Sequence, residues 1–415
     1  MKRVLIASFA ALSFAGYSQT APTTAPAAKE WDVSVYGFVR TDYIWDTRKS
    51  AQVREYNLNL YPLDEVKDAN GKDINDAGAS NFLSVVSRLG VKVKGPDVWG
   101  AKVNGTLEGD FFGNTESTIG LFRLRHAYAT LDWTKTSVTM GQTWYPTFIP
   151  EVFPGVANFS TGIMFNPFGW ASQVKIKQNL SNNISFALTA YKEREFTTAT
   201  ATGGTQNSAS INSSLPTFHG QFQFKNKNWI AGLGAEFKSL QPLTVSNNQV
   251  SDEKVNSTSF VGYFKYNNDK FHIKAYGITG GDMYNLVMLG GFAGYTTPGQ
   301  VEKYEATKTT SFWVDIASNG KSIAPGFFFG HTKNDGTGKD GATALYMRGT
   351  SGTRGVDNVW RTSARIDFKQ NKFRITPELE YTAATWGDLK SDASVGGNTK
   401  NVSNFRAMVS CVYAF

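Results

Sequence analysis

Apolar and polar side chains alternate with a period of two residues along many segments of this chain. In the clearest segment one face carries Trp31, Val33, Val35, Val39 and Tyr43, and the other carries Asp32, Ser34, Arg40 and Asp42. Successive side chains of a β-strand point to opposite faces. The alternation therefore predicts strands that have one apolar face and one wet face.

About sixteen segments carry this alternation, and an even number of strands is typical of bacterial outer-membrane barrels. They run at Trp31–Trp45, Val85–Lys94, Ala101–Phe112, Leu121–Trp133, Ser137–Tyr145, Trp170–Gln178, Ile184–Glu193, Thr217–Lys225, Trp229–Lys238, Ser257–Tyr266, Phe271–Thr279, Thr310–Ile316, Gly326–Thr332, Val359–Phe368, Phe373–Ala384 and Asn404–Phe415. We predict an all-β fold, a transmembrane antiparallel β-barrel of about 16 strands. Fourteen or eighteen strands are the alternatives, because strand ends are uncertain by a few residues.

The connections between these segments alternate between long and short from one end of the chain to the other. The long ones span Asp46–Phe82, Gly113–Gly120, Pro146–Gly169, Arg194–Pro216, Ser239–Asn256, Gly280–Thr309, Lys333–Asn358 and Thr385–Ser403. The short ones are Gly95–Gly100, Thr134–Thr136, Asn179–Asn183, Asn226–Asn228, Asn267–Lys270, Ala317–Lys321 and Lys369–Lys372. A bacterial barrel has short periplasmic turns and long extracellular loops, whereas a soluble β-sandwich has no reason to sort its loops in this way.

The N-terminus has the layout of a secretory signal peptide. Lys2 and Arg3 precede an apolar run from Val4 to Ala15, which is too short to cross a bilayer as a helix. We predict a signal peptide over residues 1–18, a flexible lead-in rich in Thr, Ala and Pro over 19–30, and a single barrel domain over 31–415. No cysteine lies near the end of the predicted signal peptide, which argues against a lipid anchor.

Composition excludes several classes of function. The formal net charge of +8 comes with interspersed acidic residues and no basic block, so we do not expect a nucleic-acid partner. Cys411 is the one cysteine, which excludes an intramolecular disulfide. The four histidines, His126, His219, His272 and His331, have no metal-ligand spacing and no GxSxG motif is present. We therefore expect no enzyme activity, no catalytic residues and no cofactor. The alternatives from other classes of function are a barrel enzyme and a structural or adhesive barrel.

The C-terminal segment supplies an independent signal for an outer-membrane location. One face of it consists of Phe405, Ala407, Val409, Cys411, Tyr413 and Phe415. This face resembles the C-terminal signature that the barrel-assembly machinery reads in bacterial outer-membrane proteins. We predict that Phe415 is recognised by that machinery, that outer-membrane lipid and lipopolysaccharide surround the barrel, and that Cys411 faces lipid or a neighbouring subunit.

The third long connection, Pro146–Gly169, differs from the others because it is mostly apolar. It is rich in phenylalanine, including Phe148, Phe153, Phe159 and Phe165, and Glu151 is its one charged residue. Exposed on an outer surface, such a segment would be an aggregation liability. We predict that residues 146–169 fold into the barrel and constrict its lumen, with packing at a subunit interface or over the barrel mouth as the alternative.

Basic residues gather on the predicted inward faces of several strands. They are Arg40, Arg88, Lys92, Lys102, Arg123, Arg125, Lys175 and Lys177, opposed by Asp42, Glu108 and Asp110. A barrel of this size leaves an aqueous lumen, and a wall with net positive charge favours anions. We predict a preference for small anionic solutes such as organic acids; the alternative is that these side chains pair with one another.

The first long connection contains a stretch rich in oxygen-bearing side chains. Asp68–Asp76 (DANGKDIND) places carboxylates and amides around Gly71, but their spacing differs from that of an EF-hand loop. The prediction is that the chain has no metal site, with calcium binding in this loop as the alternative. Lys333–Ala342 (KNDGTGKDGA) is a weaker segment of the same kind.

Three segments resemble the DcaP-like trimeric outer-membrane porins: Arg88–Gly113, Phe122–Trp133 (FRLRHAYATLDW) and Gly141–Pro146 (GQTWYP). The resemblance is strongest over Arg88–Pro146. It implies sixteen strands, a homotrimer and uptake of small organic anions, with the family's basic lumen at Arg123 and Arg125. Unlike many members, this chain has no heptad-patterned extension before its first strand.

The sequence as a whole predicts a porin of the bacterial outer membrane. It would form an aqueous channel for passive diffusion of small hydrophilic solutes, with a mild preference for anions. A substrate-specific channel that binds one nutrient class is the main alternative.

Overall fold

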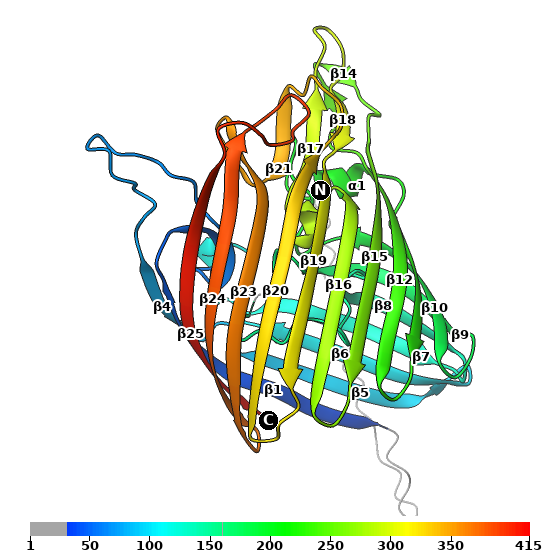
Figure 1. Cartoon of the computed structure of the whole chain (residues 1–415). Helices are drawn as coiled ribbons and strands as arrows, with labels where there is room; N and C mark the ends of the chain where they lie inside the picture. The colour runs from blue at the N-terminus through cyan, green and yellow to red at the C-terminus, as the bar shows by residue number, and fades with distance from the viewer. Residues whose placement is uncertain (1–30, 160) are drawn as a thin grey trace, which may run out of the picture.

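The structure is a computed structural model that describes residues 31–159 and 161–415. Within these residues, sixteen long strands form a closed antiparallel barrel (Figure 1). The predicted fold class is therefore confirmed. The predicted signal peptide (1–18) and lead-in (19–30) lie outside the described residues. No helix in the described part of the chain is long and apolar enough to cross a membrane.

Each barrel strand pairs with the next one along the chain, and the last pairs with the first to close the barrel. The strands are β1 (Asp32–Asp46), β5 (Arg88–Val98), β6 (Ala101–Asp110), β7 (Arg123–Asp132), β8 (Thr136–Trp144), β9 (Trp170–Asn179), β10 (Ile184–Glu193), β11 (Thr217–Lys225), β12 (Trp229–Leu240), β15 (Val255–Asn267), β16 (Phe271–Gly281), β19 (Lys308–Ser318), β20 (Ile323–Gly336), β23 (Arg354–Gln370), β24 (Phe373–Asp388) and β25 (Lys400–Ala414). Closure is made by β1 and β25 over the register from Phe38–Ala414 to Asp46–Arg406.

Every predicted strand is present, but several are longer than the sequence indicated. β20 and β23 extend over Ile323–Gly336 and Arg354–Gln370, beyond the predicted Gly326–Thr332 and Val359–Phe368. The additional residues are mostly polar or glycine, so apolar alternation could not detect them. They pair with neighbouring strands beyond the membrane-facing band.

The first long connection is more ordered than the predicted loop over Asp46–Phe82. It contains a hairpin of β2 (Ser50–Val53) and β3 (Leu58–Pro62), and then β4 (Ala79–Leu83). β4 pairs with the second half of β1, and β5 pairs with the first half. The second barrel strand is therefore interrupted between residues 83 and 88.

Short turns and long loops lie at opposite ends of the barrel, as predicted. The short turns share one end with the C-terminus and the start of β1 (Figure 1). Trp99 and Gly100 join β5 to β6 with positive φ angles of 50° and 75°, the backbone that two-residue hairpins require. In an outer-membrane barrel this end faces the periplasm.

The outer wall is apolar and the inner wall is polar. The predicted apolar face of β1 is exposed, with Val33 and Val35 each 61% accessible, while Arg40 and Asp42 on the other face are buried. On β25, Phe405 and Tyr413 are likewise exposed, as is Phe415 directly after the strand. The alternation read from the sequence thus corresponds to a membrane-facing surface around a polar interior.

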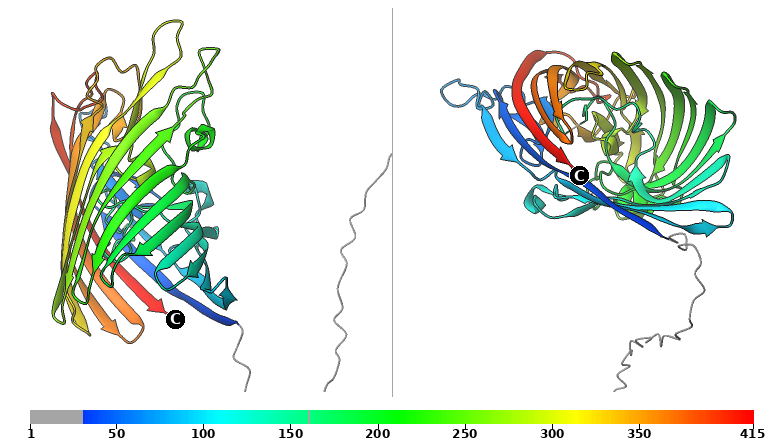
Figure 2. Two further views of the ribbon diagram at one scale, coloured as in Figure 1. Left: turned by 90° about the vertical axis from the view of Figure 1, so that its right-hand side faces the viewer. Right: turned by 90° about the horizontal axis from the view of Figure 1, so that it is seen from below.

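Three connections fold into the barrel, and the view from below shows chain inside the ring of strands (Figure 2). They are the β2–β3 hairpin, residues 146–169 and residues 282–289. In the last segment the carbonyl of Leu286 accepts a hydrogen bond from the amide of Phe168 at 3.0 Å. Their apolar side chains form one core with the inward side chains of the wall. The segment 282–289 contains η2 (Tyr284–Leu286). The remaining short elements lie in the extracellular loops: β13 (Val245–Ser246), β14 (Gln249–Val250), β17 (Gly290–Tyr295), β18 (Lys303–Ala306), β21 (Ala344–Arg348), β22 (Thr350–Ser351), η1 (Glu116–Thr118) and α1 (Ser208–Asn212).

Candidate functional site: the lumen and its third long loop

The third long loop, residues 146–169, crosses the lumen rather than covering the barrel mouth. Its backbone accepts hydrogen bonds from inward side chains of several strands. The Tyr276 hydroxyl on β16 donates to the carbonyl of Thr147 at 2.8 Å, and Arg361 on β23 donates to the carbonyl of Ile163 at 2.7 Å. These contacts satisfy loop carbonyls that would otherwise be buried without a partner.

Two carboxylates and one arginine hold the middle of the loop against the opposite wall. Glu378 on β24 accepts from the amide of Ala157 at 2.9 Å, and Asp315 on β19 accepts from the amide of Gly155 at 3.1 Å. Arg40 on β1 donates to the carbonyl of Ala157 at 2.6 Å and pairs with Asp42 at 2.8 Å. The predicted pore-lining residue Arg40 therefore anchors the loop.

The first limb of the loop, residues 146–151, is tied to β11 by its one charged residue. Glu151 forms an ion pair with Lys225 and accepts from Gln223 at 3.1 Å. Burial opposes ionisation of Glu151, but the hydrogen bond and charge of Lys225 outweigh it and hold the pKa of this carboxyl below its usual range. The limb thus lies close to the wall formed by β8–β11.

A cavity of about 180 Å³ separates this limb from the wall. Phe148 and Glu151 line it from the loop side, and Lys175 and Lys177 line it from β9. Tyr145 also lines it, and the buried ring of Tyr145 packs against Tyr191 with 5.3 Å between ring centroids.

The other phenylalanines predicted to constrict the lumen lie elsewhere. Phe153 lines a second cavity of about 360 Å³ on the periplasmic side, where Lys274 donates to its carbonyl at 3.1 Å. Phe159 and Phe165 are 6% and 0% accessible and pack in the core. The loop therefore has one limb beside the open part of the lumen and one limb in the core.

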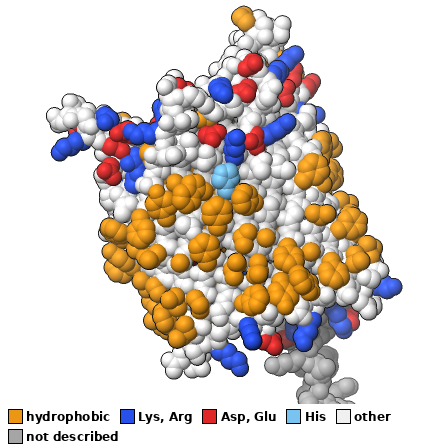
Figure 3. Space-filling model, viewed as in Figure 1, with side chains coloured by type: hydrophobic (Ala, Val, Ile, Leu, Met, Phe, Trp, Pro, Cys, Tyr) orange, Lys and Arg blue, Asp and Glu red, His pale blue; other side chains and the backbone are white. Residues whose placement is uncertain are grey.

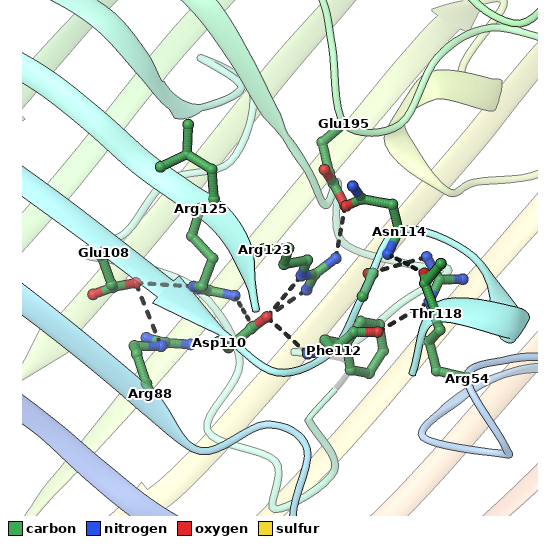
Figure 4. A network of polar contacts seen from close by, with 12 residues as sticks. Arg54, Arg88, Glu108, Asp110, Phe112, Asn114, Thr118, Arg123, Arg125 and Glu195 are labelled. Carbon is green, nitrogen blue, oxygen red and sulfur yellow. Dashed lines mark hydrogen bonds and ion pairs between the residues drawn. The ribbon is translucent and has the colours of Figure 1, made fainter. Parts of the chain in front are cut away.

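Arg123 and Arg125, the residues to which the family resemblance points, lie in a buried network of ion pairs (Figure 4). Arg123 contacts Asp110 and Glu195, each at 2.7 Å. Arg125 contacts Glu108 at 2.9 Å and Asp110 at 3.1 Å. Their side chains are 1% and 0% accessible, so these carboxylates compensate both positive charges.

Aromatic rings cover the faces of the same guanidinium groups. The Arg125 guanidinium lies 4.4 Å from the centroid of Trp170 and 5.2 Å from that of Trp144, and Arg123 lies 4.5 Å from Phe112. Cation–π contacts of this kind stabilise a desolvated arginine. The arrangement fixes the two arginines in place and removes them from contact with solvent.

Three further basic residues predicted to line the pore also contact a carboxylate or an aromatic ring. Arg88 lies 3.4 Å from Glu108 and over the ring of Phe38. Lys92 lies over the ring of Tyr36. Lys102 is exposed at the periplasmic rim and forms an ion pair with Asp97 at 2.7 Å.

Lys175 and Lys177 differ from the other predicted basic residues. Among the residues that the structure describes, neither forms an ion pair within 4.0 Å. Both side chains are partly accessible and line the cavity beside the loop. They are therefore uncompensated charges in the open part of the lumen.

The sequence reasoning missed three inward lysines, Lys225, Lys265 and Lys274. All three line the periplasmic-side cavity. Lys265 on β15 and Lys274 on β16 are direct cross-strand partners. Each of these lysines lies on the face opposite the apolar face of its own strand. The alternation along β11, β15 and β16 could therefore have identified them as inward residues.

No group of three or more potential metal-binding side chains occurs within the described ranges. In the loop Asp68–Asp76, Asp68 accepts from the amides of Asn70 and Lys72, and Asp73 pairs with Arg48 at 2.7 Å. These carboxylates stabilise the turn itself.

The comparisons with known proteins agree with this geometry. The model of the DcaP outer membrane protein family matches residues 10–297. The chain belongs to the DcaP outer membrane protein family. A comparison with curated protein sequences found no match.

Similar solved structures include the outer-membrane channel DcaP of Acinetobacter baumannii, with a TM-score of 0.65 and 19% identity over 94% of this chain and 99% of that one. An anion-selective porin from Comamonas acidovorans gives 0.57 and 14%, covering 93% and 100%. OmpT of Vibrio cholerae gives 0.53 and 13%, covering 94% and 99%. At these identities the likeness is one of fold.

Family and fold together make this member of the DcaP family an outer-membrane channel protein of the porin type. The predicted family, fold class and bacterial outer-membrane location are confirmed. They point to a channel rather than an enzyme.

Proposed function

We propose that this protein conducts small hydrophilic solutes by passive diffusion and prefers anions such as organic acids. One observation carries the proposal: the lumen contains uncompensated lysines at Lys175, Lys177 and Lys265, while Arg123 and Arg125 are paired with carboxylates. Unpaired charges in a narrow, low-dielectric passage raise the local concentration of counter-ions. Selectivity thus rests mainly on lysines, with Arg123 and Arg125 as structural residues.

The solute path runs beside the first limb of the third long loop. The cavity on the periplasmic side and the cavity between the loop and β8–β11 both contact Glu151. Lysines line both cavities, which supports a continuous path for anions. Because buried residues such as Tyr145 line the cavity beside the loop, we propose that passage requires a shift of residues 146–151 away from the wall.

Phe148 and Glu151 are the constriction residues in this proposal. Glu151 holds the limb through Lys225 and Gln223, and Phe148 stacks on Trp144 with 4.0 Å between ring centroids. Loss of either contact would let the limb move and widen the path.

The proposal extends to assembly. The outward face of β25, which ends at Phe415, is exposed to membrane, and it suits recognition by the barrel-assembly machinery and contact with lipid and lipopolysaccharide. We also propose a homotrimer formed through the barrel wall, which the mass of the detergent-extracted protein in light scattering would test.

Planar-bilayer recording tests the proposed function. The purified full chain should give stepwise conductance that needs no energy source, and small organic anions should carry current. Absence of any conductance from correctly folded protein would contradict the pore. Saturating current for a single nutrient class would instead favour a substrate-specific channel.

A further inference from the structure

The membrane-facing wall is hollowed where β12, β15, β16 and β19 lie side by side. The hollow is an apolar groove of about 750 Å³. Its sides are outward side chains, of which Leu233 and Phe312 are 71% and 45% accessible. The inward residues between them, such as Tyr263 and Trp313, are buried on the other side of the sheet.

Two glycines on adjacent strands form the floor of the groove. Gly262 on β15 is the cross-strand partner of Gly277 on β16. A Cβ at Gly262 would contact only Leu233, at 3.4 Å, and a Cβ at Gly277 would meet nothing closer than 3.7 Å. Neither glycine has a positive φ. Backbone strain and barrel packing therefore do not explain these glycines, whereas space for a ligand on the membrane side does.

The groove lies in the periplasmic half of the membrane. Phe264, one of its lining residues, is three residues from Asn267, the last residue of β15. At about 3.3 Å per residue, this distance is about 10 Å from the periplasmic turn. Half of the hydrocarbon core is about 15 Å thick, so the molecule that fills the groove belongs to the periplasmic leaflet.

The turns below the groove carry exposed lysines. Lys270 and Lys321 lie in the β15–β16 and β19–β20 turns, and Asp269 is the one carboxylate in these two turns. No ion pair engages either lysine within the described part of the chain. Basic side chains gather along the lower edge of the apolar band in Figure 3. Basic residues at a membrane surface attract anionic head groups.

We propose that this groove binds an anionic phospholipid of the periplasmic leaflet. An acyl chain lies over Gly262 and Gly277, and the head-group phosphate contacts the lysines of the turns. Apolar burial supplies the affinity of the chain, and the lysines select a net negative head group over a zwitterionic one. A second copy of the barrel is the competing occupant.

Native mass spectrometry of the full-length protein in mild detergent tests the proposal. The probes are phosphatidylglycerol and phosphatidylcholine with the same acyl chains. The wild type should retain phosphatidylglycerol more than phosphatidylcholine. The double variant Gly262→Leu with Gly277→Leu should lose most of this binding, because the leucines occupy the groove.

The matched control for groove filling is Gly105→Leu on β6. Gly105 is also an outward glycine, and its Cβ would meet nothing closer than 3.9 Å. This variant should bind phosphatidylglycerol as the wild type does. Heat-dependent mobility in SDS gels checks that each variant is folded.

A second set of variants keeps the groove intact and tests the head group. Each of Lys270→Gln and Lys321→Gln should weaken phosphatidylglycerol binding by about fivefold, which corresponds to about 1 kcal/mol per basic residue. Lys135→Gln, in the β7–β8 turn, is the control.

Three results would overturn the proposal. Unchanged lipid retention in the groove-filled variant places the lipid elsewhere. Equal retention of both lipids by the wild type removes the role of the lysines. A change in oligomeric mass on groove filling, with no lipid on the wild type, makes a second copy the occupant. None of these readouts depends on conductance.

Discussion

Lys265 and Lys274 are cross-strand partners on β15 and β16, and both side chains point into the lumen. Lys274 is 3.8 Å from Asp315, whereas Lys265 forms no ion pair with any described residue. Like charges directly opposite each other destabilise a strand pair. An anion bound in the lumen would reduce this repulsion. The stability of the barrel should therefore depend on whether anions are present near Lys265 and Lys274.

Lys265→Gln should stabilise the barrel by about 0.2–1 kcal/mol at low salt, because it removes this repulsion. The difference from the wild type should shrink at high salt, since salt screens the interaction. Urea unfolding of the purified protein at two ionic strengths measures both effects. Lys135→Gln in a periplasmic turn is the control, and lower stability of the Lys265 variant would contradict the assignment.

Neutralising Lys175 and Lys177 should reduce anion preference, because both side chains are unpaired beside the loop. The double variant Lys175→Gln with Lys177→Gln should shift the reversal potential in a salt gradient toward zero. Lys102→Gln, which removes a lysine already paired with Asp97 at the rim, should shift it less. Equal shifts would mean that the cavity lysines have no special role.

Asp110→Ala should destabilise the barrel by about 3–5 kcal/mol, because it leaves the buried Arg123 and Arg125 without a shared partner. Asp97→Ala breaks the exposed pair with Lys102 and should change stability by about 0–1 kcal/mol. Denaturant midpoints compare the two variants. Similar losses of stability in the two variants would show that burial does not determine how much the ion-pair network contributes to stability.

The contact of Glu151 with Lys225 should persist in mildly acidic solution. Since the pKa of Glu151 is below its usual value, its contribution is present above the ordinary value of about 4.3 and is lost as pH falls through the lower value of the folded state. Single-channel conductance of the wild type should therefore be steady from neutral pH to about pH 4 and change below it.

Glu151→Gln should already show the low-pH conductance at neutral pH, because it removes the charge that holds the limb. Its conductance should respond little to acid. Identical pH profiles for variant and wild type would exclude Glu151 as the group that controls the limb.

The fold was predictable because the alternation of side chains and the lengths of the loops can be read directly from neighbouring residues in the sequence. The apolar content of residues 146–169 was the signal that predicted their entry into the lumen. The apolar residues Met283–Leu289 carry a similar signal, which the sequence reasoning overlooked. The β2–β3 hairpin mixes polar and apolar side chains and gives no such signal.

The sequence did not allow a prediction of which carboxylates pair with Arg123 and Arg125. Which carboxylate meets Arg123 or Arg125 depends on strand register, and the β6–β7 register shifts between Glu108 and Gly109. This shift places Asp110 opposite Arg123. A single sequence shows that the charges exist, but the register decides which of them remain free.

The reversal potential in a planar bilayer with a potassium chloride gradient tests the central claim most directly. A lumen in which Lys175, Lys177 and Lys265 are unpaired predicts a potential of the sign that marks chloride as the more permeant ion. A potential of the opposite sign, which marks potassium as the more permeant ion, would contradict the account.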